Sequence, residues 1–233
     1  GNSSAVSGGR DNVAGWDSAA VGGGEGNRAM GTKSFVGGGG SNTASGQWSH
    51  VGGGAANTAS GRNSTVSGGE VNCAGGGASW AGGSRAKIRL GLDSGEVGSG
   101  CAGVPVVSDP IGGDVGTFVW AGDYFAVEDF TSTGAGQFLV LAPGGVGFNT
   151  NAPTTDFDVV GNRNGHAMLV HNDSTSSPDG LAIRVNVAGN PTTANNFLTF
   201  QRADGSAVGS VEGNGAGGVS FNTSGGDYAE WLP

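Results

Sequence analysis

Charged residues are scarce in this chain of 233 residues, and this scarcity excludes several classes of protein. Asp, Glu, Lys and Arg together make up 12% of the sequence, which argues against a disordered, highly charged chain. Acids outnumber bases by 19 to 10 without a basic patch, so we expect no nucleic-acid partner. No apolar run approaches the length that crosses a bilayer, so we also expect no membrane span.

Cysteine is equally rare, which excludes a disulfide-rich scaffold. The two cysteines are Cys73 and Cys101. One bridge, within a chain or between chains, and two unpaired thiols are both open alternatives. Cys73 directly precedes Ala74, which the pattern described below points inward, so we expect Cys73 to face outward.

Candidate metal ligands are also few. Of the three histidines, His166 and His171 lie five residues apart and have no nearby cysteine, so the usual zinc spacing is absent. Asp156 and Asp158 fall on one face of a strand, but solvated edge charges explain them better than a calcium site. We expect no catalytic residue, no metal and no cofactor.

Glycine, by contrast, is abundant, and its 51 residues follow no Gly-X-Y period, which excludes collagen. Over residues 4–84 the chain instead repeats every fifteen residues. An inward aliphatic residue recurs at Val6, Val21, Val36, Val51 and Val66. An asparagine follows six residues later, at Asn12, Asn27, Asn42, Asn57 and Asn72. A small apolar residue comes two positions after that, at Ala14, Ala29, Ala44, Ala59 and Ala74.

Each repeat therefore predicts one coil with two short strands and two tight turns. The segments around the Val and the Ala alternate with period two, which points these side chains toward a thin shared core. The intervening glycines suit corners that require positive φ. We expect the asparagines to form a ladder at one corner, each amide bonding to the next coil. Such a coil buries too little to fold alone, so stacking supplies its stability.

The units SAVSGGRDNVAG, SHVGGGAANTASG and STVSGGEVNCAGG resemble the left-handed parallel β-roll of YadA-like heads in trimeric autotransporter adhesins and related phage and bacterial fibre proteins. The usual repeat of that family is near fourteen residues, so fifteen implies one longer turn. The resemblance covers about a third of the chain and implies an all-β, homotrimeric fibre.

Beyond the roll we expect short-stranded β modules. The predicted organisation is a roll at 1–84, a linker or neck at 85–116, a shoulder or stalk module at 117–155 and a C-terminal β module at 156–226. Strands are predicted at 117–120, 124–127, 137–141, 157–160, 167–171, 181–187, 197–201, 207–211 and 219–222 by their β-branched and aromatic content, with antiparallel pairing. The basic cluster Arg85, Lys87 and Arg89 fits either pairing with acids of neighbouring chains or a solvated turn.

Two later stretches carry weaker resemblances. GTFVW, DFTSTGAGQFLV and GGVGFNTNAP resemble segments that follow such rolls in fibre proteins. FNTSGGDYAEWLP resembles the beginning of autoproteolytic intramolecular-chaperone domains, so residues 227–233 are expected to start a truncated or cleaved segment. On this resemblance Pro233 is not expected to be the natural end of the gene product.

One outward stripe carries Phe35, His50 and Trp80, each directly before an inward residue. Exposed apolar groups in a row favour a contact, with another chain rather than with a sugar. We therefore expect a non-catalytic, adhesive subunit of an extracellular trimeric fibre, on a cell surface, a virion or an injection system. The expected partners are itself, as a parallel homotrimer with possible head-to-tail assembly, and a surface glycan or receptor.

Two alternatives come from other classes. A tailspike that binds or depolymerises polysaccharide would need paired acids in a groove, whereas Asp11, Asp17, Glu25 and Glu70 share no face pattern. An ice-binding solenoid would need a flat outward array of threonine. The outward stripe has Thr65 alone, so this alternative ranks last.

Overall fold

The structure is a computed structural model that describes residues 2–108, 112–122, 128–161, 167–169, 181–184 and 187–223. The predicted strand at 124–127, the segment 227–233, His166 and His171 lie outside these residues. The chain forms two compact units, residues 1–161 and residues 162–233.

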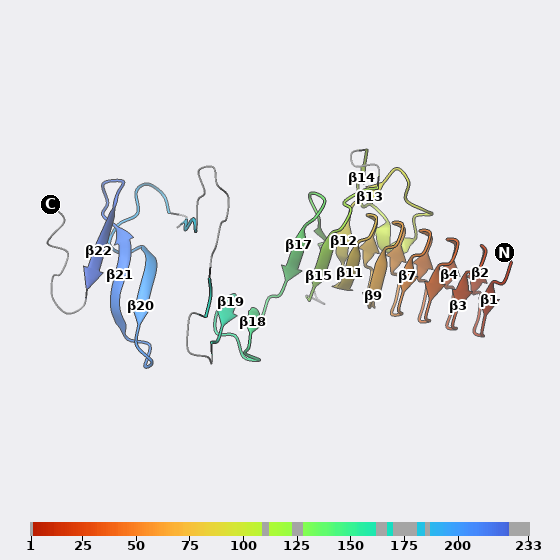
Figure 1. Cartoon of the computed structure of the whole chain (residues 1–233), viewed down its shortest axis with the longest axis horizontal. Helices are drawn as coiled ribbons and strands as arrows, with labels where there is room; N and C mark the ends of the chain where they lie inside the picture. Colours follow the sequence, from red (N-terminus) through yellow and green to blue (C-terminus); the bar gives the residue numbers. More distant parts are fainter. Residues whose placement is uncertain are drawn as a thin grey trace. The chain divides into compact units, whose positions relative to one another are not determined.

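The first unit contains a parallel β-solenoid in which each fifteen-residue coil contributes one strand to each of two sheets (Figure 1). The eight-stranded sheet consists of β1 (Ala5–Val6), β3 (Ala20–Val21), β5 (Phe35–Val36), β7 (His50–Val51), β9 (Thr65–Glu70), β11 (Trp80–Ser84), β15 (Phe118–Ala121) and β17 (Phe138–Leu141). The seven-stranded sheet consists of β2 (Val13–Ala14), β4 (Arg28–Ala29), β6 (Thr43–Ala44), β8 (Thr58–Ala59), β10 (Cys73–Ala74), β12 (Ala86–Ile88) and β16 (Phe130–Thr131). The predicted all-β solenoid is thereby confirmed.

The core between the sheets is thin, as the repeat predicts. The inward Val and Ala rows form one buried cluster, and Val36, Val51 and Ala59 have no exposed surface. Val6 is an exception, because it is 44% exposed, although it pairs in register with the buried Val21. Val6 was predicted as a core residue, and that prediction is wrong for this position.

The asparagine ladder is present, and its bonds run mainly to backbone groups. Asn42 Oδ1 accepts from the Asn57 N–H (3.0 Å), and Asn57 Oδ1 accepts from the Asn72 N–H (3.0 Å). Asn57 Nδ2 donates to the Gly53 carbonyl of its own coil and to the Gly69 carbonyl of the next coil (2.9 and 2.8 Å). Each of these side-chain amides therefore closes its own turn and joins it to the next coil.

Both corners of the coil require left-handed backbone. At one corner the asparagine is preceded by Ser41, Ala56 or Val71, each with φ near +55°. At the other corner Lys33, Trp48 and Asn63 have φ of 57–58°. Residues other than glycine adopt this region at a cost of roughly 1–2 kcal/mol each. The continuous bonds between coils hold the corners in place.

The solenoid continues beyond residue 84, where the sequence predicted a linker and then a separate module. β12 pairs with β10, so the second sheet continues through Ala86–Ile88. β15 then pairs in parallel with β11, and β17 pairs in parallel with β15. Residues between β12 and β15 form an excursion that returns to the same stack, with β13 (Leu90–Gly91), β14 (Val106–Val107) and the short 3-10 helix η1 (Ser99–Cys101). The predicted boundary at 84 and the predicted antiparallel pairing of 117–141 are wrong.

The remaining strands lie outside the solenoid. β18 (Val146–Phe148) and β19 (Phe157–Val159) pair in parallel within the first unit. The second unit contains an antiparallel sheet of β20 (Asn196–Gln201), β21 (Ala207–Gly213) and β22 (Val219–Thr223), which confirms three predicted strands and the turn at Gly205. The described parts of the predicted strands at 167–171 and 181–187, residues 167–169 and 181–184, are not strands.

Candidate interaction surfaces

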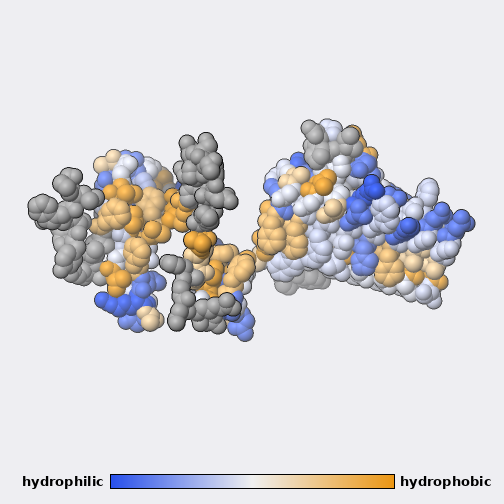
Figure 2. All heavy atoms as spheres, in the orientation of Figure 1, coloured by the Kyte–Doolittle hydropathy of each residue, from blue (hydrophilic) through white to orange (hydrophobic). Residues whose placement is uncertain are grey.

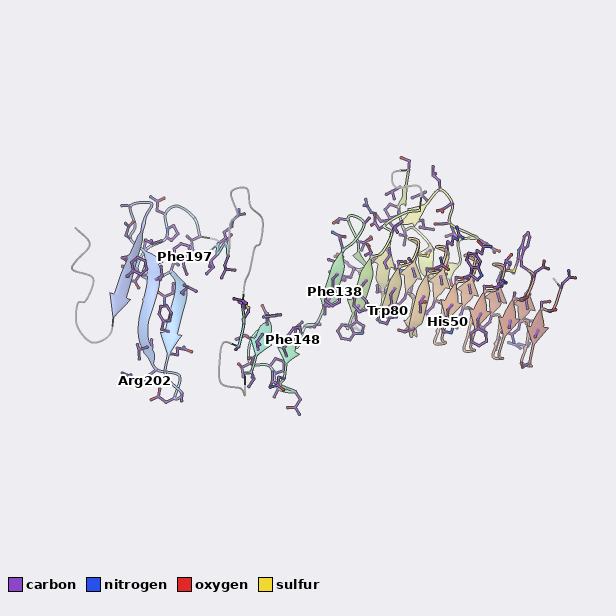
Figure 3. All side chains as sticks on the ribbon, in the orientation of Figure 1. His50, Trp80, Phe138, Phe148, Phe197 and Arg202 are labelled. Atoms are coloured by element: carbon purple, nitrogen blue, oxygen red, sulfur yellow. A yellow bond between two sulfur atoms is a disulfide. The ribbon has the colours of Figure 1, made fainter. Side chains whose placement is uncertain are left out.

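The outer face of the eight-stranded sheet carries a stacked row of aromatic side chains. Phe35 stacks on His50 with ring centroids 5.3 Å apart. Trp80 stacks on Phe118 at 4.4 Å, and Phe118 stacks on Phe138 at 4.8 Å. These distances follow the spacing of hydrogen-bonded strands, about 4.8 Å, because the residues occupy one register position. Figure 3 shows His50, Trp80 and Phe138 in a line along the stack.

We call this row the aromatic ladder. Its members are Phe35, His50, Thr65, Trp80, Phe118 and Phe138. The predicted stripe of Phe35, His50 and Trp80 belongs to it, whereas Phe118 and Phe138 were not predicted as members. Phe138 is 74% exposed, and Figure 2 shows apolar residues gathered at β17.

A sequence signal for the two missed rings exists. Phe118 directly precedes the buried Val119, just as Trp80 precedes the buried Ala81. The same aromatic–aliphatic pair recurs, but the spacing from Ala81 to Val119 is no multiple of fifteen because the excursion intervenes. A search for the pair, independent of period, would have found both rings.

The outer face of the seven-stranded sheet differs from that of the eight-stranded sheet, because a segment of the same chain lies on it. We call residues 92–105, which belong to the excursion after β12, the strap. The Gly95 N–H donates to the Ser60 carbonyl (2.9 Å), and Ser45 Oγ donates to the Glu96 carbonyl (2.6 Å). Under the strap, Thr58 has no exposed surface. Val13, on the same register row, is 39% exposed.

Glycines allow the strap to lie flat on the sheet. A Cβ at Gly100 would collide with the carbonyl of Asn72, and a Cβ at Gly95 would collide with the carbonyl of Ser45. At Gly98 a Cβ would come within 2.5–2.7 Å of the Thr43 and Thr58 side chains. The strap therefore depends on glycine at three positions of close approach.

A disulfide fixes the strap to the sheet. Cys73 of β10 is bonded to Cys101 at the end of η1, and the two lie in a small apolar cluster with Leu90 and Val104. Cys73 does point away from the solenoid core, as predicted, but it is fully buried because the strap covers it. Of the alternatives left open by the sequence, the structure contains the bridge within one chain.

The basic cluster pairs with acids of its own chain. Arg89 donates from Nε and Nη2 to the two carboxylate oxygens of the buried Asp114 (2.8 and 2.9 Å), and this hydrogen bonding raises the pKa of Arg89. Lys87 is 1% exposed, and its Nζ donates to the carbonyls of Val71 and Gly100 (both 2.6 Å). Burial lowers the pKa of Lys87, and the charge of Asp129 partly opposes this shift. The prediction of a solvated turn is wrong.

Removing the disulfide should loosen the strap without unfolding the coils. A bridge between residues 28 apart in sequence stabilises the native state by about 3.5 kcal/mol in the chain-entropy relation. We expect the Cys73→Ser and Cys101→Ser double variant to expose the strap to proteolysis, while the solenoid retains its β-type circular dichroism. Limited proteolysis followed by mass spectrometry measures the cut sites. Resistance of residues 92–105 equal to that of the parent would contradict this prediction.

Two acids of the solenoid, Glu25 and Glu70, lie too far apart to act together as the carboxyl pair of a glycosidase. Glu25 and Glu70 share one corner position, in the register Glu25, Gly40, Ala55 and Glu70, which corrects the prediction that they share no face pattern. Three coil steps place them about 14 Å apart. Glycosidases hold their two carboxyl groups about 5–9.5 Å apart. Glu25 is also paired with Arg10 of the neighbouring coil.

Asp158, one of the two acids weighed in the sequence as calcium ligands, is hydrogen-bonded to a threonine four residues earlier. Asp158 Oδ2 accepts from the N–H and the hydroxyl of Thr154 (3.0 and 3.2 Å). Where the structure describes the chain, no three His, Cys, Asp or Glu side chains gather closely enough to bind a metal ion. The same residues include no helix with the length and hydropathy that crossing a bilayer requires.

Comparison with known proteins found no matching protein family, no matching curated protein and no matching solved structure. The arrangement of the two sheet faces is therefore the main guide to function.

Proposed function

We propose that this chain is a non-catalytic subunit of a homotrimeric extracellular fibre, built like the left-handed YadA-type roll and used for attachment to a surface. The aromatic ladder is the observation that carries this proposal. Its rings, from Phe35 to Phe138, lie on one side of a rod of stacked coils, in a position to contact parallel copies.

The contrast between the two sheet faces supports the choice of the ladder as the contact between chains. The strap and its disulfide cover the seven-stranded sheet with residues of the same chain. The eight-stranded sheet keeps large apolar groups exposed instead, including Phe35 at 39% and Phe138 at 74%. Three copies related by a threefold axis would bury three such ladders together, which removes apolar surface from water.

The disulfide supports the proposed location. Disulfides form and persist in oxidising compartments, which include the bacterial cell exterior and virion surfaces. A solenoid of this kind is also suited to a mechanical role, because each coil is bonded to its neighbours along the whole stack.

The assembly is tested by light scattering on the purified chain at low concentration. The expected molar mass is three times the chain mass of 22.6 kDa. Phe138→Asp should reduce the mass to that of one chain, because it places a charge within the proposed contact. Circular dichroism should remain unchanged, since Phe138 is largely exposed in the single chain.

Leu92→Asp is the matched control. Leu92 is 65% exposed and belongs to the strap, so it offers a comparable apolar surface outside the ladder. The control should remain trimeric. A folded, stable monomer of the parent chain would overturn the proposed assembly.

A further inference from the structure

One corner of the solenoid carries side chains that the assembly proposed above does not use. Successive coils place a polar residue three positions after each inward alanine, and we call this row the polar edge. Its members are Asp17, Thr32, Gln47 and Arg62. Backbone bonds between coils fix their register, since the Lys33 N–H donates to the Asp17 carbonyl (2.9 Å) and the Trp48 N–H donates to the Thr32 carbonyl (3.0 Å). Four different hydrogen-bonding groups therefore follow one another at steps of about 4.8 Å.

A groove lies between the polar edge and the strap. It has a volume of about 410 Å3, and its walls include Trp16, Met30, Thr32 and Gln47 from the coils and Glu96 from the strap. The indole of Trp16 is 57% exposed. The groove thus combines one large aromatic surface with an amide, a hydroxyl and a carboxylate, which both donate and accept hydrogen bonds.

A second indole lies on the same edge, at Trp48, where the backbone disfavours it. Trp48 has φ of +57°, a region in which a bulky side chain is an outlier. Its side chain is 39% exposed, and Arg62 stacks over the ring at 4.8 Å. The neighbouring coils place Lys33 and Asn63 at this position with the same left-handed φ, so the backbone does not select an indole here. Trp16 and Trp48 belong to coils two steps apart, about 10 Å along the stack.

Charges of both signs surround this groove. Glu96 accepts two hydrogen bonds from Arg28 Nη2 (both 3.0 Å), and Asp17 accepts from the Asn2 N–H (2.8 Å). Arg62 is engaged with the ring of Trp48. A polyanion would therefore meet little net positive field here.

We propose that the groove and the polar edge bind a linear, neutral oligosaccharide. The C–H faces of sugar rings would stack on Trp16 and Trp48, whose π faces carry negative charge density, while Gln47, Thr32 and Glu96 exchange hydrogen bonds with hydroxyl groups. The regular coil step gives a repeating ligand a repeating surface. This inference names the ligand class of the proposed attachment role and rests on that role for its biological setting, whereas the site itself lies within one chain.

The test titrates the full chain with six linear neutral hexasaccharides, namely the cello-, chito-, manno-, xylo-, malto- and laminari-hexaoses, and with a heparin hexasaccharide. Calorimetry measures Kd for the parent and three variants. We expect at least one neutral hexasaccharide to bind, and Trp16→Ala and Trp48→Gly each to weaken that binding at least tenfold. Trp48→Gly relieves the left-handed strain, so weaker binding in this variant cannot come from loss of fold.

Lys33→Gly is the matched control, because Lys33 occupies the same corner position one coil earlier, with φ of +58°. It removes the same strain together with a positive charge and should leave Kd within twofold. Absence of binding by all six neutral hexasaccharides would overturn the inference. Equal Kd values for the parent and both tryptophan variants, or binding of heparin alone, would overturn it as well. Light scattering of the same samples reports the trimer separately, so failure of either proposal is recognised on its own.

Discussion

Val51→Asp should strongly destabilise the solenoid. Val51 has no exposed surface and lies between Val36 and Val66, which are equally buried. A carboxylate there would enter a core only one aliphatic layer deep, with no basic side chain in the buried cluster to pair with it. Uncompensated buried charge costs several kcal/mol, so we expect the free energy of unfolding to fall by more than about 4 kcal/mol.

The first coil provides the matched control for this substitution. Val6 occupies the same register position but is 44% exposed, so Val6→Asp leaves its charge in water. We expect a change within about 0.5 kcal/mol for this variant. Urea titration followed by circular dichroism compares the two. Equal effects of the two substitutions would show that the register assigned to the valine row is incorrect.

Asn57→Leu should cost nearly as much, although it adds no charge and keeps the number and branching of the side-chain heavy atoms. The Asn57 side chain makes four hydrogen bonds, donating to the carbonyls of Gly53 and Gly69 and accepting from the N–H and the amide of Asn72. Leucine leaves these partners unsatisfied in a buried corner. Each orphaned group costs about 1–3 kcal/mol, so we expect a loss of about 4 kcal/mol or more.

Asn12→Leu is the corresponding change in the outermost coil. Asn12 donates to the carbonyls of Gly8 and Gly24 (both 2.8 Å), which are exposed bonds, and accepts from the Asn27 N–H (2.9 Å), which is partly buried. Water can replace the two exposed bonds and the Asn27 N–H alone is orphaned, so this variant should lose about 1–3 kcal/mol. Thermal melting of the two variants measures the difference. A smaller effect at Asn57 than at Asn12 would mean that the ladder contributes to the turn alone and not to stacking.

The repeat made the solenoid predictable wherever its period is kept. Fifteen-residue spacing placed the inward Val and Ala rows, the asparagine corner and the outward position of Phe35, and the pairing between coils agrees with each of these. Only short-range rules enter here, because alternation sets the facing of side chains and the period sets the stacking.

Prediction failed where the period is interrupted. The chain leaves the stack after β12 and rejoins it at β15. The fifteen-residue repeat therefore does not predict Phe118 or the later solenoid strands β15, β16 and β17. The lack of periodicity at the strap predicts a linker, whereas its glycines permit close approach to the sheet. Pairing of Lys87 with Asp129 depends on residues far apart in sequence, which no local pattern reports.

Because each coil bonds to its two neighbours along the stack, the length of the solenoid can change in fixed steps of one coil. Insertion or loss of fifteen residues adds or removes one step of about 4.8 Å and keeps every valine, asparagine and ring in its row. An insertion of another length keeps this register only where the extra residues leave the stack, as the residues between β12 and β15 do. Gain or loss of whole coils would therefore adjust the length of the proposed fibre, and the number of sugar units that the proposed site can contact, without any change to the fold.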